Sequence, residues 1–240
     1  MKIENILNHP ELVDSKQMVQ DMNDNMIGRV ALNKGAQSTH ILYIIRELVE
    51  DNCKKVLDIG TLWGGSMITM MQSKYDSHFV SIDLFDGYYK ASTGLTEDPV
   101  CGGTNTIESV TKNIDKHNKH NHSYNLVEGS SHDSEVVKKV YSLLENHVDL
   151  LFIDGDHTKA GVLEDWKDYS GLVRKGGIVI FDDHWSGELA QYAWRHKDHW
   201  TEPKAMDIVG AYKEISEEKS FKDNWVQIGL IEDKMIIERI

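Results

Sequence analysis

The alternation of two kinds of apolar pattern along the chain constrains its fold more than any other feature. Short apolar runs that end at or next to Asp or Gly recur at 54–60, 78–83, 125–128, 149–154 and 177–181. Between them lie stretches with apolar residues at helical spacing, and a similar stretch at 37–52 precedes the first run. Strands that alternate with helices predict a parallel sheet covered on both faces, because parallel strands need helical crossovers. We therefore expect an α/β, doubly wound architecture.

The two ends of the chain differ from this repeating part. Residues 224–230 and 234–238 are two extended runs separated by a short turn, which predicts an antiparallel C-terminal hairpin. Together with the five earlier runs, the hairpin gives a mostly parallel, seven-stranded sheet. We expect residues 1–36 to form a helical N-terminal extension and residues 37–240 to form the main domain.

Residues 87–104 interrupt the regular pattern, because this segment is longer than the usual connection between a strand and its helix. It follows the second strand, so it emerges at the carboxyl ends of the strands, where ligands bind in this architecture. We expect a lid over the ligand, with a disordered surface insertion as the alternative.

The composition excludes several classes of function. The 240 residues include 26 Lys and Arg against 39 Asp and Glu, which gives a formal net charge of −13. This balance disfavours nucleic-acid binding, which needs clustered basic residues to neutralise phosphates. No apolar run approaches the ~20 residues that span a bilayer, and the N-terminal residues lack an apolar stretch of signal-peptide length. With only Cys53 and Cys101, we expect a cytoplasmic protein with free thiols that acts on small molecules.

Residues 58–66 form a glycine-containing turn between a predicted strand and a predicted helix. Gly60 and Gly64 would let the backbone turn tightly and approach a ligand, and Asp58 suits a positively charged cofactor better than a pyrophosphate. Asp83 ends the next strand, where an acidic side chain accepts the hydroxyls of a ribose. A nicotinamide cofactor is the alternative, but its G-x-G-x-x-G pattern fails at Leu62. A purely structural turn is the other alternative.

The segment after the third strand, Gly129 to Asp133, offers a further part of the same site. Asp133 is placed to cap the next helix, and Ser131 and His132 are placed to reach an adenine. We weigh a capping role and a binding role evenly here.

Acidic residues also follow the fourth and fifth strands. Asp154 and His157 follow one strand, and Asp182, Asp183 and His184 follow the other. Neighbouring carboxylates repel unless a cation or protons offset their charge, and oxygen ligands suit Mg²⁺, Mn²⁺ or Ca²⁺. The alternatives are an iron site with both histidines and one carboxylate, and a solvated strand end with no ligand.

These motifs resemble a known family. The segment VLDIGTLWGGS, 56–66, resembles the first motif of class I S-adenosylmethionine-dependent methyltransferases. FIDGDH, 152–157, and GGIVIFDDHW, 176–185, resemble the metal-dependent small-molecule O-methyltransferases. These include the catechol type and the type that methylates sugars in macrolide and aminocoumarin biosynthesis. Lys34 to Gln37 also resemble the catechol type, and the likeness covers roughly residues 33 to 240.

The resemblance implies a Rossmann-like methyltransferase fold and a set of residues for each ligand. S-adenosylmethionine would be held at its methionine part by Gly60, Gly64 and Ser66, at its ribose by Asp83, and at its adenine by Ser131 and His132. Asp58 and Gly129 would belong to the same cofactor site. A Mg²⁺ ion, or another divalent cation, would be ligated by Asp154, Asp182 and Asp183.

The resemblance also implies a reaction. His157 lies where the catechol type has a lysine base, and some sugar methyltransferases use a histidine there, so His157 and Asp154 are the expected catalytic residues. The catechol type has Asn at the position of Asp183 and lacks the 87–104 insertion. We therefore expect methylation of a sugar or glycosylated natural product. The alternatives are a catechol or phenolic acceptor, a non-catalytic S-adenosylmethionine-binding protein and a nicotinamide-dependent oxidoreductase. The expected partner is a hydroxylated small molecule, with no nucleic acid and no membrane; monomer and homo-oligomer both stay open.

Overall fold

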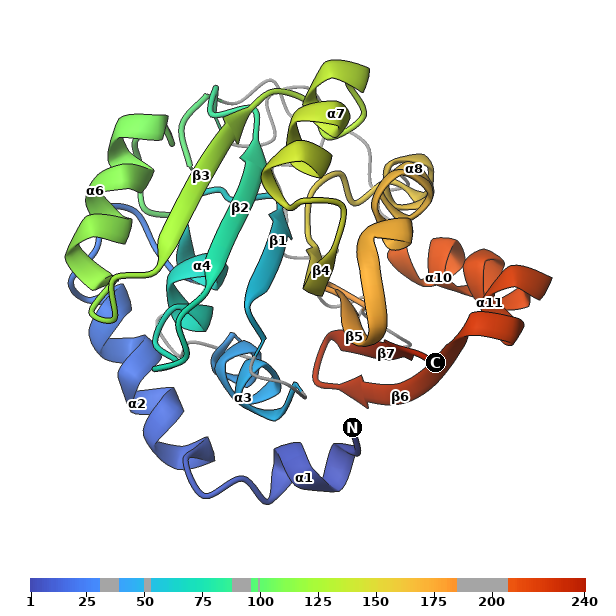
Figure 1. The fold of residues 1–240 in the computed structure, drawn as a ribbon. Coiled ribbons are helices and arrows are strands. Elements are labelled where there is room, and N and C mark those ends of the chain that lie inside the picture. Colours follow the sequence, from blue (N-terminus) through green and yellow to red (C-terminus); the bar gives the residue numbers. More distant parts are fainter. Residues whose placement is uncertain (31–38, 50–52, 88–95, 99, 185–206) are drawn as a thin grey trace.

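The computed structural model describes residues 1–30, 39–49, 53–87, 96–98, 100–184 and 207–240. Its centre is one seven-stranded sheet with the strand order β3-β2-β1-β4-β5-β7-β6 (Figure 1). Strands β1 to β5 pair in parallel, and β7 pairs antiparallel with β5 and β6. The predicted doubly wound sheet with a C-terminal antiparallel hairpin is therefore confirmed. The strands are β1 Lys55–Ile59, β2 His78–Asp83, β3 Ser123–Glu128, β4 Val148–Ile153, β5 Val173–Phe181, β6 Trp225–Ile231 and β7 Lys234–Arg239.

Helices cover both faces of this sheet. Alternate side chains of β4 enter two different cores, Leu150 and Phe152 on one face and Leu151 and Ile153 on the other. Helices α1, α2, α3, α4 and α6 supply the first core, and α7, α8, α10 and α11 the second. The helices are α1 Ile3–Leu7, α2 Leu12–Asn23, α3 His40–Leu48, α4 Gly65–Met70, α6 Ile107–His117, α7 Ser134–Leu143, α8 Lys159–Tyr169, α10 Ile208–Glu217 and α11 Lys219–Asn224, with a 3-10 turn at Ser170–Leu172. No helix of the described residues is long and apolar enough to cross a bilayer.

The N-terminal helices belong to the first core. Ile6 of α1 and Val19 and Met22 of α2 are buried with α3. The predicted boundary at residues 36 and 37 lies outside the described residues, as do 37–38 and 50–52 of the predicted first helix. The division into extension and main domain stays a prediction.

Strand β5 begins at Val173, four residues before the predicted Gly177. Of the additional residues, Val173 is apolar and buried, but Arg174, Lys175 and Gly176 carry no apolar pattern. They extend the strand because the Arg174 guanidinium pairs with the Asp149 carboxylate, which also accepts the backbone N–H groups of Lys54 and Lys55 at 2.8 and 2.7 Å.

Helices α7 and α8 begin directly after the strand-end motifs, α6 begins after the 87–104 insertion, and each of the three is capped by a side chain. Thr106 accepts the N–H of Ser109 before α6, Asp133 accepts that of Glu135 before α7, and Thr158 accepts that of Gly161 before α8. The predicted cap at Asp133 is confirmed. These caps fix where each loop at the carboxyl edge of the sheet ends.

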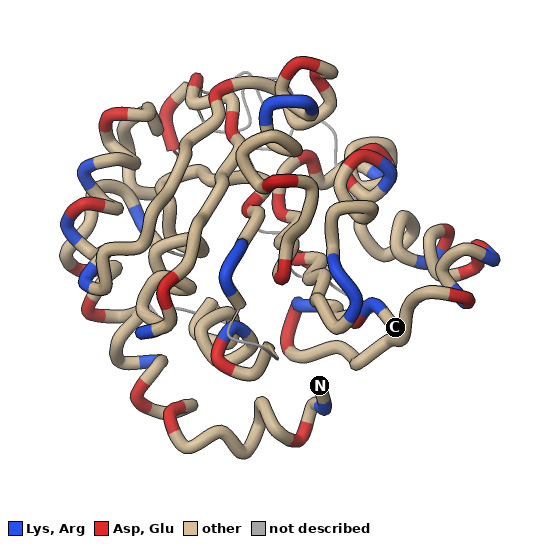
Figure 2. The backbone as a smooth tube through the Cα atoms, viewed as in Figure 1, with Lys and Arg blue, Asp and Glu red and all other residues tan. Residues whose placement is uncertain are grey.

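Charged residues of both signs are interspersed along the outer helices (Figure 2). Exposed pairs such as Lys112 with Glu108 and Lys138 with Glu135 lie within single helices. Such pairs contribute little to stability, so the fold rests on its two apolar cores.

Candidate active site

The glycine turn of residues 60–64 lies directly against the end of β4. Gly60 and Gly64 have φ of +95° and +85°, a conformation that other residues rarely adopt. A Cβ atom at Gly60 would lie 2.1 Å from the carbonyl oxygen of Asp154, so only glycine allows this approach. Ser66 lies half-buried in the first turn of α4. The structure therefore brings the two motifs together, one predicted for the cofactor and the other for the metal.

Asp58 is fully buried beneath this turn. The Ser81 hydroxyl donates to Asp58 Oδ2, whereas Asp58 Oδ1 has no hydrogen-bond partner among the described residues. Burial raises the pKa of Asp58 to about 8, and the hydrogen bond from Ser81 offsets part of the effect. Asp58 is therefore largely protonated at neutral pH in the ligand-free protein.

This burial predicts a pH dependence of stability. The folded-state pKa of about 8 lies above the unfolded value of roughly 3.9, so unfolding releases a proton between these limits. The contribution of Asp58 to the free energy of unfolding is fully present below pH ~4 and is lost as pH rises through the folded-state pKa, at up to ~1.4 kcal/mol per pH unit. Urea unfolding of wild type and Asp58→Asn at pH 5, 7 and 9 measures this loss. The variant is expected to lose less stability with rising pH; parallel slopes would contradict the assignment.

Asp83 lies at the end of β2 and holds the glycine turn. Its Oδ2 accepts the N–H of Leu62 at 2.8 Å and its Oδ1 that of Phe85 at 2.9 Å. Burial raises the pKa of Asp83, whereas these backbone bonds lower it. Asn105 also donates to Leu62 O at 3.3 Å and to Asp83 Oδ1 at 3.4 Å. Asn105 could not be predicted from the sequence, because a single amide after a long insertion carries no pattern.

The loop after β3 approaches the same edge. Gly129 has φ +139°, and its N–H donates to Asp83 O at 2.9 Å. The Tyr169 hydroxyl donates to Ser131 O at 2.6 Å, and His132 Nδ1 lies 3.6 Å from Asp165 Oδ1. Helix α8 thus holds the two residues that sequence analysis assigns to the adenine.

Asp165 is a buried acid that sequence analysis did not single out. Its side chain is fully enclosed, and burial raises its pKa to about 7. Its position on α8 gave no signal, since a polar residue in an amphipathic helix is usually exposed.

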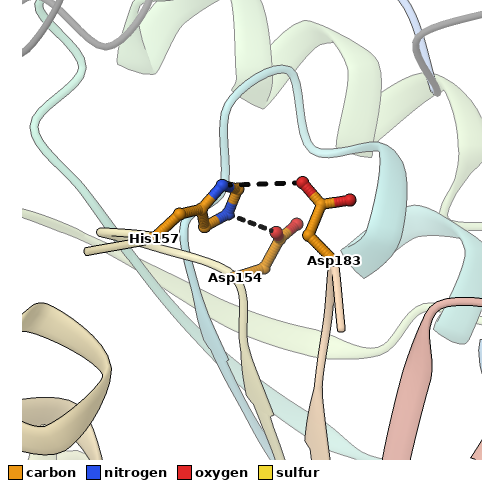
Figure 3. Close-up of side chains that lie close together, drawn as sticks. All are labelled: Asp154, His157 and Asp183. Atoms are coloured by element: carbon orange, nitrogen blue, oxygen red, sulfur yellow. Dashed lines mark hydrogen bonds and ion pairs between the residues drawn. The ribbon is translucent and has the colours of Figure 1, made fainter. Parts of the chain in front are cut away.

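Figure 3 shows His157 between two carboxylates that come from different strand ends. His157 Nε2 lies 3.0 Å from Asp154 Oδ1, and Nδ1 lies 3.5 Å from Asp183 Oδ2. The imidazole is 4% exposed, and one potential ligand atom from each of the three residues lies within 4.8 Å of the others. Asp183 reaches this position with φ +51°, which Asp tolerates better than most residues.

Asp182, the third predicted ligand, faces a different partner. Lys234 Nζ donates to Asp182 Oδ1 at 2.5 Å and to Asp233 Oδ1 at 3.1 Å. Asp182, Asp183 and Asp233 form a second group with ligand atoms within 4.8 Å. The structure thus divides the predicted triad between two groups that share Asp183. Lys234 and Asp233 lie in the C-terminal hairpin and were not found from the sequence.

His184, the second histidine of the alternative iron site, lies apart from both groups in the described residues. Its buried ring packs edge-on against Tyr212, with 5.4 Å between ring centroids, and its backbone N–H donates to Asp233 O at 2.7 Å. This arrangement favours oxygen ligands at the strand ends.

The segment predicted as a lid is described only in part, because residues 88–95 and 99 lie outside the described residues. Its described part is anchored on the glycine turn by Asp98. Asp98 Oδ2 accepts the Trp63 indole N–H at 2.9 Å and Arg29 Nε at 2.8 Å. The Arg29 and Asp98 side chains are 8% and 1% exposed. This buried contact joins the N-terminal part, the glycine turn and the insertion.

Comparison with known proteins places the chain in a family. Residues 57–184 match the family model described as a methyltransferase domain. An uncharacterized protein of Acanthamoeba polyphaga mimivirus is 30% identical over 177 residues, which cover 72% of this chain and 71% of that protein.

Solved structures of methyltransferases share the fold. The calicheamicin methyltransferase CalS11 matches with a TM-score of 0.55 and 15% identity, over 96% of this chain and 93% of that chain. The MycE methyltransferase from the mycinamycin biosynthetic pathway, in complex with Mg and SAH, matches with a TM-score of 0.54 and 16% identity, over 96% of this chain and 55% of that chain. The likeness at such identities concerns the fold alone. The family that the motifs predict is confirmed by the matching family model, and the chain belongs to the methyltransferase-domain family.

Proposed function

We propose that this protein is an S-adenosylmethionine-dependent O-methyltransferase that uses Mg²⁺, or another divalent cation, and acts on a hydroxyl of a sugar or glycosylated natural product. The position of His157 between Asp154 and Asp183, against the glycine turn, is the observation that carries the proposal. CalS11 and MycE, from calicheamicin and mycinamycin biosynthesis, support the choice of acceptor.

The cofactor would lie along the carboxyl edge of the sheet. The glycine turn of Gly60 and Gly64, with Ser66, would receive the methionine part, and Asp83 the ribose. Ser131 and His132, which α8 holds, would flank the adenine, with Gly129 at the base of that loop. The buried Asp58 lies beneath the turn, where the positive charge of a bound sulfonium would lower the pKa of Asp58 and favour its carboxylate form.

The chemistry of the acidic residues fits a divalent cation. Asp154 and Asp183 offer hard oxygen atoms at two adjacent strand ends, with Asp182 in the neighbouring group that shares Asp183, and like charges this close need a counter-charge. When bound there, a divalent cation supplies a Lewis acid that makes an acceptor hydroxyl more acidic.

His157 would accept the proton of the acceptor hydroxyl. Its ring contacts Asp154 and Asp183, so either carboxylate stabilises the imidazolium that forms. The acceptor oxygen then forms a bond to the methyl carbon while the bond from that carbon to sulfur breaks. The sulfonium becomes the neutral sulfide S-adenosylhomocysteine, so atoms and charges balance.

Calorimetric titration with S-adenosylmethionine and with S-adenosylhomocysteine, each with and without Mg²⁺, tests the proposal. We expect both to bind, followed by methyl transfer to a member of a panel of nucleotide sugars and catechols. Turnover of catechols alone would favour the phenolic alternative. Binding without turnover of any acceptor would favour a non-catalytic protein, and absence of binding would contradict the cofactor assignment.

A further inference from the structure

Two groups of carboxylates compete for a cation at the ends of β4 and β5. One is Asp154 with His157 and Asp183, and the other is Asp182 with Asp183 and Asp233. Asp183 belongs to both, so an ion bound by Asp183 could take its other ligands from either group. The two groups differ in the side chain of Lys234, which pairs with Asp182 and Asp233 of the second.

The register between β5 and β7 places Lys234 next to Asp182. Phe181 of β5 pairs with Met235 of β7, and because the strands are antiparallel, Asp182 comes opposite Lys234. The turn at the start of β7 is fixed from the other side by the Asp233 carbonyl, which accepts the N–H of His184 at 2.7 Å. The contact between Lys234 and Asp182 is therefore set by backbone pairing.

The ammonium of Lys234 is buried as well as paired. Its side chain is 2% exposed, and Nζ lies 6.0 Å from the centroid of the Phe152 ring. Its two carboxylate partners are also largely enclosed, because the Asp182 and Asp233 side chains are 13% and 7% exposed. Lys234 thus brings a buried, paired ammonium to the second group.

A divalent cation in the second group would lie beside this ammonium. Two of the three carboxylates there already bind Nζ, and repulsion between cations is strong in a buried environment. The third member of the first group is the imidazole of His157, in place of an ammonium.

We propose that Lys234 is the built-in counter-ion of Asp182 and Asp233, and that a divalent cation is confined to the side of Asp154 and Asp183. Asp182 is then a partner of Lys234 and not a metal ligand. This inference rests on the proposed metal dependence, and it departs from the three-aspartate site that the motif resemblance implies.

Binding of Mn²⁺ alone to the purified full chain, followed by the loss of the free-ion electron paramagnetic resonance signal, tests this. Wild type is expected to bind one ion. Asp154→Asn and Asp183→Asn are expected to weaken binding by about 100-fold or more, since they remove ligands, and Asp182→Asn by no more than about threefold. Asp156→Asn, which removes an exposed carboxylate near the site, is the matched control for lost charge.

A double variant separates the charge pair from the site. Asp182→Asn with Lys234→Met removes one charge of each sign, and we expect its Mn²⁺ affinity to stay within about threefold of wild type. Lys234→Met alone frees the second group, and where it folds we expect a second bound ion. The double variant keeps the test decisive when the single variant does not fold.

The outcomes distinguish the role of Lys234 from the proposed metal dependence. Loss of Mn²⁺ binding in Asp182→Asn as severe as in Asp183→Asn, with wild type still binding, overturns the role of Lys234 and leaves the proposed function intact. A wild-type protein that binds S-adenosylhomocysteine but no Mn²⁺ overturns the metal dependence and, with it, this inference.

Discussion

Replacement of His157 by alanine is expected to lower kcat by about 10²–10⁴-fold, the usual contribution of a positioned general base. The imidazole between Asp154 and Asp183 is the proposed general base. Alanine at this position removes the group that accepts the proton of the acceptor hydroxyl. The dissociation constant of S-adenosylhomocysteine is expected to stay within about twofold, because the cofactor residues lie on other strand ends.

Steady-state kinetics with an acceptor from the panel, together with calorimetry of S-adenosylhomocysteine, measure both quantities. His120→Ala, at an exposed histidine before the start of β3 and therefore at the other end of that strand from the site, is the control and should keep full activity. An unchanged kcat in His157→Ala would remove this residue from the mechanism. A parallel loss of cofactor affinity would point instead to a structural role.

Replacement of Asp98 by alanine is expected to lower the free energy of unfolding by about 3–5 kcal/mol, as for other broken buried ion pairs. The change leaves the Arg29 guanidinium buried without this carboxylate and takes away the acceptor of the Trp63 indole. The N–H of Val100, which donates to Asp98 Oδ1 at 2.8 Å, also loses its partner. The melting temperature should fall by roughly 6–20 °C for a chain of this size.

Thermal and urea unfolding measure this effect, and Asp76→Ala, at an exposed aspartate, is the control with little expected change. The double variant Arg29→Met with Asp98→Leu should be less destabilised than Asp98→Ala, because neither charge remains buried alone. Equal stability of Asp98→Ala and wild type would show that this contact does not hold the insertion.

The sheet could be predicted because its strands carry their own signal. The runs Val56–Ile59 and Leu150–Ile153 are buried on both faces, so the second is apolar throughout and the first is apolar except for the buried Asp58. Each is followed by a short, distinctive motif. Once the strands are parallel, their carboxyl ends share one edge, and this placed Gly60 near Asp154.

The missing parts of the site arise from contacts between distant segments. Lys234 and Asp182 are 52 positions apart, and Arg29 and Asp98 are 69 apart. A lone lysine at the start of a hairpin strand looks like a solvated charge, and its contact depends on the antiparallel register, which the apolar pattern does not specify to one residue. The domain boundary and the lid stay predictions, because they involve residues outside the described ranges.

The backbone bonds that tie the strand ends together have a consequence for how the acceptor can vary. Gly60 N bonds to Ile82 O, Asp154 N to Ile59 O and Asp182 N to Ile153 O, at 2.9, 2.9 and 3.0 Å. Adjacent strands lie ~4.8 Å apart, so roughly 14 Å separates the end of β2 from that of β5. In the proposed reaction, the spacing of the strands fixes the distance between the ribose of the cofactor and the acceptor oxygen. New acceptors would then be accommodated by the segments above this edge, while the point of methyl transfer stays where it is.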